Sequence, residues 1–187
     1  MTSTSTDLQL PDIHPFTGMS VWSLLVGRAA QHPDALLMTW EPFDAQRQSW
    51  TYAQFVRECE AVGAGLQARG IAPGDRIVIH MENRPEFLVT WFACAAIGAV
   101  AVTTNSRSSE DELTYFIGNC GARAAVTQPD FAPLVRAAGP ELDWVAVIRS
   151  GGEDGFDALR AAPEDLRAAE SDPAAPLSIQ YTSGTTS

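Results

Sequence analysis

A helix-like segment between two short apolar runs constrains the fold of this chain most. Residues 76–80 and residues 99–103 are apolar runs typical of strands, and residues 87–97 between them are apolar on nearly every side. Parallel strands need a long crossover connection, usually a helix, so this order predicts a βαβ unit. A helix that is apolar all round is expected to be buried. The chain should therefore build a parallel sheet covered by helices.

The same alternation continues on both sides of this unit. The predicted strands are residues 35–40, 49–52, 123–127, 144–148 and 177–181. The predicted helices are residues 21–31 and 131–138, together with the segments that follow two capping boxes, Thr51 with Gln54 and Ser109 with Glu112. Strands 35–40 and 49–52 are close enough to form a hairpin. Such alternation is typical of an open α/β domain.

Polar residues before the apolar segments predict where helices begin. Ser20 is the predicted N-cap of the first helix. Asn83, with Glu86 three positions later, is the predicted N-cap of the buried helix. Residues 161–176 are rich in Ala, Asp, Glu and Pro, so we expect them to form a solvated connection.

Length and composition limit the class of protein. A chain of 187 residues with 45% apolar and 19% charged residues fits one globular domain, which we expect to be residues 20–187 after a flexible tail at residues 1–19. The net charge of −11 argues against binding to nucleic acid or to anionic membranes. We find no signal peptide and no convincing membrane span, so we expect no integral membrane association.

Cysteine and basic residues point to an intracellular chain without a metal site. Cys59, Cys94 and Cys120 lack paired metal-ligand spacing, so we expect free thiols in a reducing cytoplasm. All twelve basic residues are arginine. Any chemistry that needs a lysine amine must therefore come from elsewhere.

The segment Tyr-Thr-Ser-Gly-Thr-Thr-Ser at residues 181–187 carries the most specific chemistry. Its glycine and hydroxyl side chains suit a loop whose N–H and O–H groups converge on one anion. The alternative is an ordinary polar turn, because serine, threonine and glycine are common in turns. No Gly-Lys-Ser/Thr follows, as a Walker A loop requires, and the spacing is not that of a Gly-x-Ser-x-Gly nucleophile elbow.

Residues 181–186 resemble the phosphate-binding signature of the adenylate-forming superfamily, which holds acyl-CoA synthetases, luciferases and peptide-synthetase adenylation domains. Patches at residues 50–52, 70–78, 98–107 and 120–123 extend the resemblance over residues 20–187. Ser187 stands where the family usually has glycine, and here it resembles the carnitine and crotonobetaine type of CoA ligase. The resemblance implies a partial N-terminal AMP-binding domain that ends inside its phosphate-binding loop, either as a fragment or through a truncated reading frame.

The resemblance also implies an activity. The parent enzyme would activate a small-molecule carboxylic acid with ATP and Mg²⁺ as an acyl-adenylate, from which the thiol of coenzyme A displaces AMP. The residues that would contact the ATP phosphates are Thr182, Ser183, Gly184, Thr185, Thr186 and Ser187. Catalytic residues are expected downstream of Ser187, so we expect the 187-residue chain alone to be inactive.

Two further residues lie at or just after the ends of predicted strands, where parallel α/β sheets bind ligands. By the resemblance, Arg107 would approach the nucleotide phosphate of coenzyme A. The alternative is a surface arginine that neutralises Glu110 or Asp111. His80 either orients a loop near a ligand or is simply hydrogen-bonded at a strand end.

Other functions stay open at this point. The chain could be a stand-alone nucleotide- or phosphate-binding module, a non-catalytic remnant, or part of a peptide-synthetase-type adenylation domain with a carrier-protein thiol as the acceptor. The sequence identifies neither the acid nor the oligomeric state.

Overall fold

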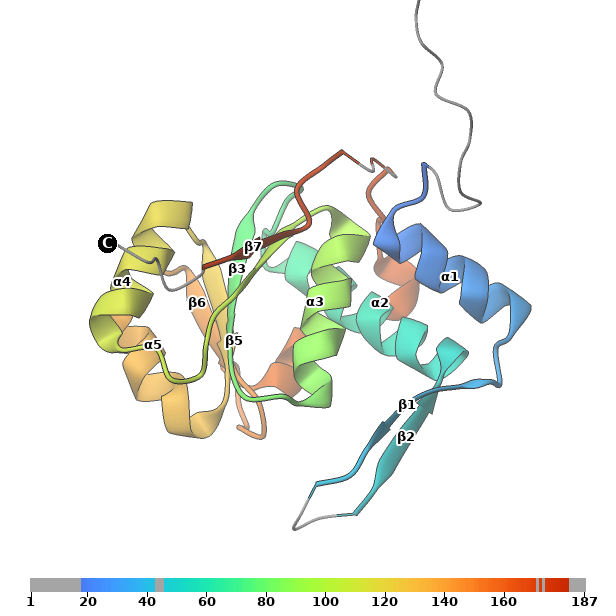
Figure 1. Cartoon of the computed structure of the whole chain (residues 1–187), viewed down its shortest axis with the longest axis horizontal. Helices are drawn as coiled ribbons and strands as arrows, with labels where there is room; N and C mark the ends of the chain where they lie inside the picture. The colour runs from blue at the N-terminus through green and yellow to red at the C-terminus, as the bar shows by residue number, and fades with distance from the viewer. Residues whose placement is uncertain (1–17, 43–45, 171, 173, 182–187) are drawn as a thin grey trace, which may run out of the picture.

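The computed structural model describes residues 18–42, 46–170, 172 and 174–181. A five-stranded parallel sheet lies at the centre of this part of the chain (Figure 1). The strand order is β6-β5-β3-β4-β7, and every neighbouring pair is parallel. The strands are β3 (Arg76–His80), β4 (Val100–Thr103), β5 (Ala124–Thr127), β6 (Trp144–Val147) and β7 (Ser178–Gln180). The predicted α/β class with a parallel sheet is confirmed.

Helices cover both faces of this sheet (Figure 1). One face carries α4 (Glu110–Cys120) and α5 (Ala132–Ala138), and the other carries α2 (Tyr52–Ala68) and α3 (Pro85–Ile97). The helix α1 (Val21–Gln31) packs against α2 and α3. Alternation along β3 explains the two layers, because Ile77 and Ile79 join the α2/α3 core while Val78 joins the α4/α5 core.

A separate hairpin precedes α2. The strands β1 (Leu36–Trp40) and β2 (Gln48–Thr51) pair antiparallel, as predicted. The second strand leads directly into the helix, because Thr51 accepts the Gln54 N–H while the Gln54 side chain accepts the Thr51 N–H. The matching box of Ser109 and Glu112 begins α4. Both capping predictions are therefore confirmed, as is the Ser20 cap of α1.

The predicted cap of α3 is wrong. Arg84, not Asn83, is the N-cap, and its side chain makes no capping hydrogen bond. Pro85 occupies the first turn, where its fixed φ suits a helix and its missing N–H leaves one donor fewer to satisfy. The residue before a proline avoids the helical region, so the helix begins at Pro85 and Asn83 remains in the preceding loop.

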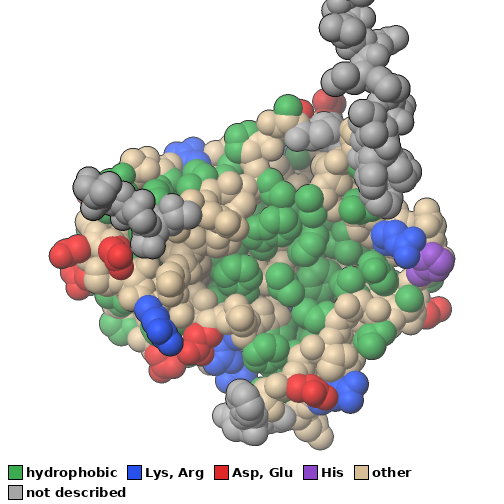
Figure 2. All heavy atoms as spheres, in the orientation of Figure 1, with side chains coloured by type: hydrophobic (Ala, Val, Ile, Leu, Met, Phe, Trp, Pro, Cys, Tyr) green, Lys and Arg blue, Asp and Glu red, His purple; other side chains and the backbone are tan. Residues whose placement is uncertain are grey.

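The expected burial of α3 holds for one side only. Val89, Ala93 and Cys94 are buried in the α2/α3 core. Trp91 and Phe92 on the same helix are half-buried, and Leu88 is exposed. Figure 2 shows hydrophobic side chains gathered over this side of the molecule. The Phe92 ring contacts Phe55 of α2 with centroids 5.6 Å apart, so described residues cover this outer side of α3 only in part.

The connection at residues 161–176 is solvated as predicted, since its described residues are all exposed or half-buried, but it is also held against the domain. Its described part contains a short 3-10 turn, η3 (Pro163–Asp165), and Leu166 packs against the α2/α3 core. A backbone hydrogen bond holds it against α3, since the Ala169 N–H donates to the Ala96 carbonyl at 2.8 Å. Just before this connection, the backbone of Leu159 passes very close to Gly65 of α2. Only glycine allows this contact, because a Cβ at residue 65 would lie 1.3 Å from the Leu159 carbonyl oxygen.

A search of the described helices for length and apolar character finds none that could cross a membrane.

Candidate functional site

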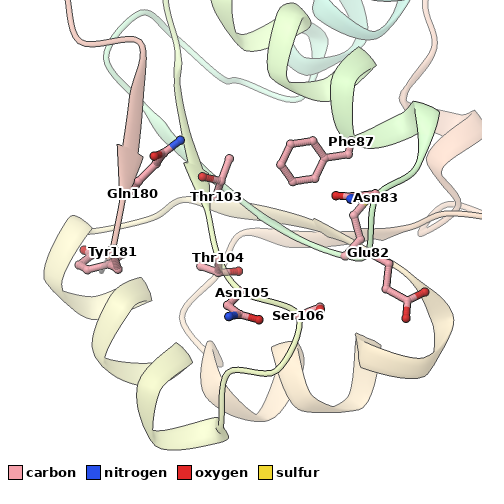
Figure 3. Close-up of a pocket in the computed structure, with 10 residues that line it drawn as sticks. Glu82, Asn83, Phe87, Thr103, Thr104, Asn105, Ser106, Gln180 and Tyr181 are labelled. Atoms are coloured by element: carbon pink, nitrogen blue, oxygen red, sulfur yellow. The ribbon is translucent and has the colours of Figure 1, made fainter. Parts of the chain in front are cut away.

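A cleft of about 660 Å³ opens at the carboxyl edge of the sheet, where β3, β4 and β7 end side by side (Figure 3). In parallel α/β sheets, ligands bind outside this edge because the connecting loops converge there. The lining residues are Met81, Glu82, Asn83, Phe87, Thr103, Thr104, Asn105, Ser106, Gln180 and Tyr181.

The cleft is lined mainly by neutral polar groups. Asn83 and Gln180 supply amides from opposite sides, and Thr103 supplies a hydroxyl between them (Figure 3). The Phe87 ring forms an apolar wall beside Asn83. Glu82 is the one charged side chain among the described lining residues. The cleft can therefore offer hydrogen bonds in several directions to a polar ligand.

The loop after β4 has a defined shape. The Asn105 side-chain oxygen accepts the Arg107 N–H at 2.9 Å, and the Asn105 carbonyl accepts the Ser108 N–H at 2.9 Å. An asparagine that bonds the backbone two residues on makes a local turn without help from a ligand. This turn lies between the cleft and the N-terminus of α4.

His80 lies under the cleft and connects neighbouring strands. Its Nδ1 is 2.8 Å from Thr104 Oγ1, and its carbonyl accepts the Thr127 hydroxyl at 2.6 Å. The Phe131 ring lies 5.0 Å from the imidazole. Burial lowers the pKa of His80, because a charged imidazole would lose hydration. The prediction of a hydrogen-bonded histidine at a strand end is confirmed.

A second link joins the loop after β3 to the residue after β5. Gln128 is buried, and its side-chain oxygen accepts the Glu82 N–H at 2.9 Å. Gln128 was not predicted as a site residue, and neither Asn83 nor Gln180 was predicted to line a cleft. The available signal was their position at or just after predicted strands, where polar residues meet in a parallel sheet.

Tyr181 brings the start of the predicted phosphate loop to the rim of the cleft. Its ring stacks on Phe116 of α4, with centroids 4.1 Å apart and planes at 16°. Its hydroxyl donates to the Asn119 side-chain oxygen at 2.8 Å. The six predicted phosphate contacts, Thr182, Ser183, Gly184, Thr185, Thr186 and Ser187, lie outside the described residues.

Arg107 lies in the loop that follows β4, and it is exposed. The structure gives it no ion pair with any described residue, and Glu110 and Asp111 nearby are exposed as well. The described residues also bring together no group of three His, Cys, Asp or Glu side chains that could hold a metal ion.

Comparison with known proteins identifies a family whose sequence pattern this chain matches. The family described as "AMP-binding enzyme" matches residues 25–187. The long-chain-fatty-acid–CoA ligase FadD13 of Mycobacterium tuberculosis is 33% identical over 143 residues, which are 73% of this chain and 27% of that protein. A crotonobetaine/carnitine–CoA ligase of Salmonella arizonae is 29% identical over 178 residues, which are 89% of this chain and 34% of that protein.

Solved structures agree with this match. The N-terminal domain of FACL13 from Mycobacterium tuberculosis, with a bound inhibitor, superimposes with a TM-score of 0.78 at 29% identity, covering 90% of this chain and 42% of that one. The anthranilate–CoA ligase AuaEII, bound to anthranoyl-AMP, also has a TM-score of 0.78, at 26% identity, covering 89% of this chain and 32% of that one. The chain thus spans about a third or less of the length of the curated relatives named above. Because the family match covers most of its residues, this chain belongs to the AMP-binding enzyme family.

Proposed function

We propose that this chain is the N-terminal part of an enzyme that activates a carboxylic acid with ATP and transfers it to coenzyme A. The observation that carries the proposal is the family match, which continues through residues 181–187. The relatives FadD13 and the crotonobetaine/carnitine enzyme are both named CoA ligases, which supports coenzyme A as the acceptor. In this proposal, residues 20–187 are one incomplete AMP-binding domain.

The proposed reaction has two steps. A carboxylate oxygen of the acid attacks the α-phosphorus of ATP, the bond between that phosphorus and the bridging oxygen to the β-phosphate breaks, and pyrophosphate leaves. The CoA thiolate then attacks the acyl carbonyl, and AMP leaves with the former carboxylate oxygen. The first step needs positioning and stabilisation of negative charge more than covalent help from the protein.

This chain contributes phosphate-binding groups to the first step. In the proposal, the N–H and O–H groups of residues 182–187 bind the β- and γ-phosphates as charge develops on the departing pyrophosphate. The place of Tyr181 supports it, because this residue lines the cleft at the carboxyl edge and contacts α4. Mg²⁺ would accompany ATP, and we assign it no protein ligand in this chain.

Arg107 is the proposed contact for the nucleotide phosphate of coenzyme A. Its exposure, its place after β4 and its lack of an ion pair with described residues support this role. We also place the reaction in the cytoplasm. The free cysteines Cys59, Cys94 and Cys120 are compatible with a reducing compartment.

Exchange of labelled pyrophosphate into ATP tests the proposal. The full-length protein that carries this chain should catalyse exchange with at least one acid from a panel of short-chain, long-chain, aromatic and trimethylammonium carboxylic acids. Exchange that stays at the no-protein blank with every acid would overturn the proposal. Residues 1–187 alone should give no exchange, because they contain no lysine and the catalytic residues are expected downstream of Ser187.

A further inference from the structure

The imidazole of His80 is fully buried, yet it contacts a loop of the cleft directly. Its Nδ1 lies 2.8 Å from the hydroxyl of Thr104, the first residue after β4. The Phe131 ring also packs on the imidazole, with centroids 5.0 Å apart and planes at 54°. A ligand in the cleft does not reach His80, because this side chain has no exposed surface. Any effect of His80 on a bound ligand must therefore pass through the residues that it contacts.

Thr104 is held to β3 by its backbone as well as by its side chain. Its N–H donates to the Ile79 carbonyl at 3.3 Å, and its hydroxyl lies 3.4 Å from the same oxygen. A hydroxyl can accept one hydrogen bond while it donates another. The Nδ1–H of His80 can therefore donate to Thr104 Oγ1 while that hydroxyl donates to Ile79. Together these bonds fix the point at which the chain leaves β4.

The loop that starts at Thr104 is short and is held at both ends. Asn105 accepts the Arg107 N–H on its side chain and the Ser108 N–H on its carbonyl, both at 2.9 Å. Ser108 is buried, and Ser109 caps α4. Arg107 lies between these two anchors, and its side chain is exposed. Its place relative to the sheet thus depends on Thr104 at one end of the loop and on α4 at the other.

We propose that His80 and Thr104 are positioning residues for Arg107, and that their hydrogen bond sets how well this arginine meets an anionic phosphate. The inference rests on the proposed function, because it takes Arg107 as the contact for the nucleotide phosphate of coenzyme A. A hydrogen bond from a guanidinium to a phosphate depends steeply on distance and angle. Loss of the His80–Thr104 bond therefore weakens binding of coenzyme A while the guanidinium itself stays in the protein.

Substitution at the buried end of this bond separates positioning from direct contact. Thr104 also lines the cleft, so its hydroxyl could meet a ligand itself (Figure 3). His80→Leu removes the partner of that hydroxyl and leaves Thr104 unchanged. His80→Asn keeps a polar group near the position of Nδ1, so it should preserve the bond that His80→Leu removes.

Thr127 offers a matched control on the other side of His80. It is buried, and its hydroxyl donates to the His80 carbonyl at 2.6 Å. Thr104→Val and Thr127→Val thus delete the same group from two threonines that bond the same histidine. Only Thr104 belongs to the loop that carries Arg107. Both variants should lower the urea midpoint of unfolding, and only Thr104→Val should change the binding of coenzyme A.

The test follows thioester formation by the full-length protein from supplied acyl-adenylate at varied concentrations of coenzyme A. The apparent KM for coenzyme A should rise about threefold to tenfold in Thr104→Val and in His80→Leu, the equivalent of one lost hydrogen bond. It should stay near the wild-type value in His80→Asn and Thr127→Val. The apparent KM for ATP in pyrophosphate exchange should stay near the wild-type value in all four variants.

Arg107→Ala completes a double-mutant cycle. Alone, it should raise the KM for coenzyme A about tenfold or more, because a bond to a charged group is lost. Adding Thr104→Val to Arg107→Ala should raise this KM no further, because Thr104 acts through an arginine that is no longer present. This cycle and His80→Asn decide the question even if His80→Leu does not fold.

Three results would overturn the inference while the proposed function stands. The first is a wild-type KM for coenzyme A in Thr104→Val. The second is an equal effect of Thr104→Val with and without Arg107, which would assign its hydroxyl to direct contact. The third is an equal rise in Thr127→Val, or in the KM for ATP, which would assign the bond to the fold. A wild-type KM in Arg107→Ala overturns the proposed role of Arg107 and the inference with it, and a wild-type protein that forms no thioester overturns the proposed function before any variant is made.

Discussion

The amino ends and the carboxyl ends of the parallel strands form two edges of the sheet, and their polar residues are used in opposite ways. At the amino edge, the Arg123 guanidinium binds Asp75 at 2.8 Å and Asp143 at 2.7 Å, and it also donates to the Gly70 carbonyl. Nearby, Arg76 donates to the carbonyl oxygens of Cys120 and Gly121. Arg123 and Arg76 are thus matched by fixed acceptors, which leaves these two cations little to offer a ligand.

The carboxyl edge leaves polar groups available. The side chains of Asn83, Thr103 and Gln180 face a cleft, and no hydrogen bond to another described residue occupies them. His80 Nε2 is buried there without a partner among the described residues. Charged groups that already have hydrogen-bond partners stabilise the fold, whereas neutral donors and acceptors without partners can bind a ligand. The contrast assigns stability to one edge and binding to the other.

The largest expected effect lies at the carboxyl edge. Replacing Thr185 and Thr186 together with valine keeps β-branching and nearly the same volume but deletes two hydroxyl donors. A hydrogen bond to a charged group contributes about 1.5–3 kcal/mol, so losing one should slow adenylation about tenfold to hundredfold. Pyrophosphate exchange by the full-length protein measures this loss.

Two controls sharpen that measurement. Thioester formation from supplied acyl-adenylate should change far less, because pyrophosphate has already left. Thr39→Val removes a hydroxyl from the β1–β2 hairpin, where it bonds Ser49, and should leave exchange unchanged. Equal losses in both half-reactions of the double variant would favour the alternative of an ordinary polar turn.

The next effect lies at the amino edge and should appear in stability alone. Asp75→Ala removes the acceptor for the Ala72 N–H and for Arg123, so the free energy of unfolding should fall by about 1–2 kcal/mol. Asp154→Ala, in the exposed pair with Arg136, is the matched control and should change it by about 0.5 kcal/mol or less. Urea unfolding checks both. A loss of exchange activity in Asp75→Ala at unchanged stability would break the contrast between the edges.

The smallest effect concerns pH. Burial lowers the pKa of His80, so the unfolded chain binds more protons below the ordinary histidine pKa of about 6.5. The stabilisation is present above that pH and is lost as the pH falls below it, at no more than about 1.4 kcal/mol per pH unit. His80→Asn keeps a polar group near Nδ1 and removes the titration, so its unfolding free energy should depend less on pH between 7 and 5. The exposed His32→Asn is the control, and a wild-type slope in His80→Asn would contradict the account.

Local signals predicted most of the fold, and long-range pairing explains what they missed. The Thr51 and Ser109 caps depend on residues three positions away, so the sequence alone reveals them. The start of α3 was missed because the effect of Pro85 on Arg84 outweighs the capping preference of Asn83. Residues 161–176 are held against the domain because Leu166 packs on a core that is built from distant segments of the chain.

The candidate site divides in the same way. Residues 181–187 carry a recognisable pattern, whereas the cleft depends on strand order. Gln180 comes near Asn83 only because β7 pairs with β4 across more than seventy intervening residues. No local pattern contains that pairing. Polar residues after predicted strands were the only trace of it in the sequence.

Hydrogen–deuterium exchange with and without a non-hydrolysable ATP analogue tests the contrast between the edges most directly. In the full-length protein, the analogue should slow amide exchange in peptides that cover residues 178–187 and 103–108 at the carboxyl edge. Peptides that cover residues 70–76 and 121–124 at the amino edge should exchange at unchanged rates. Protection confined to the amino-edge peptides, or no protection at the carboxyl edge under saturating analogue, would contradict the account.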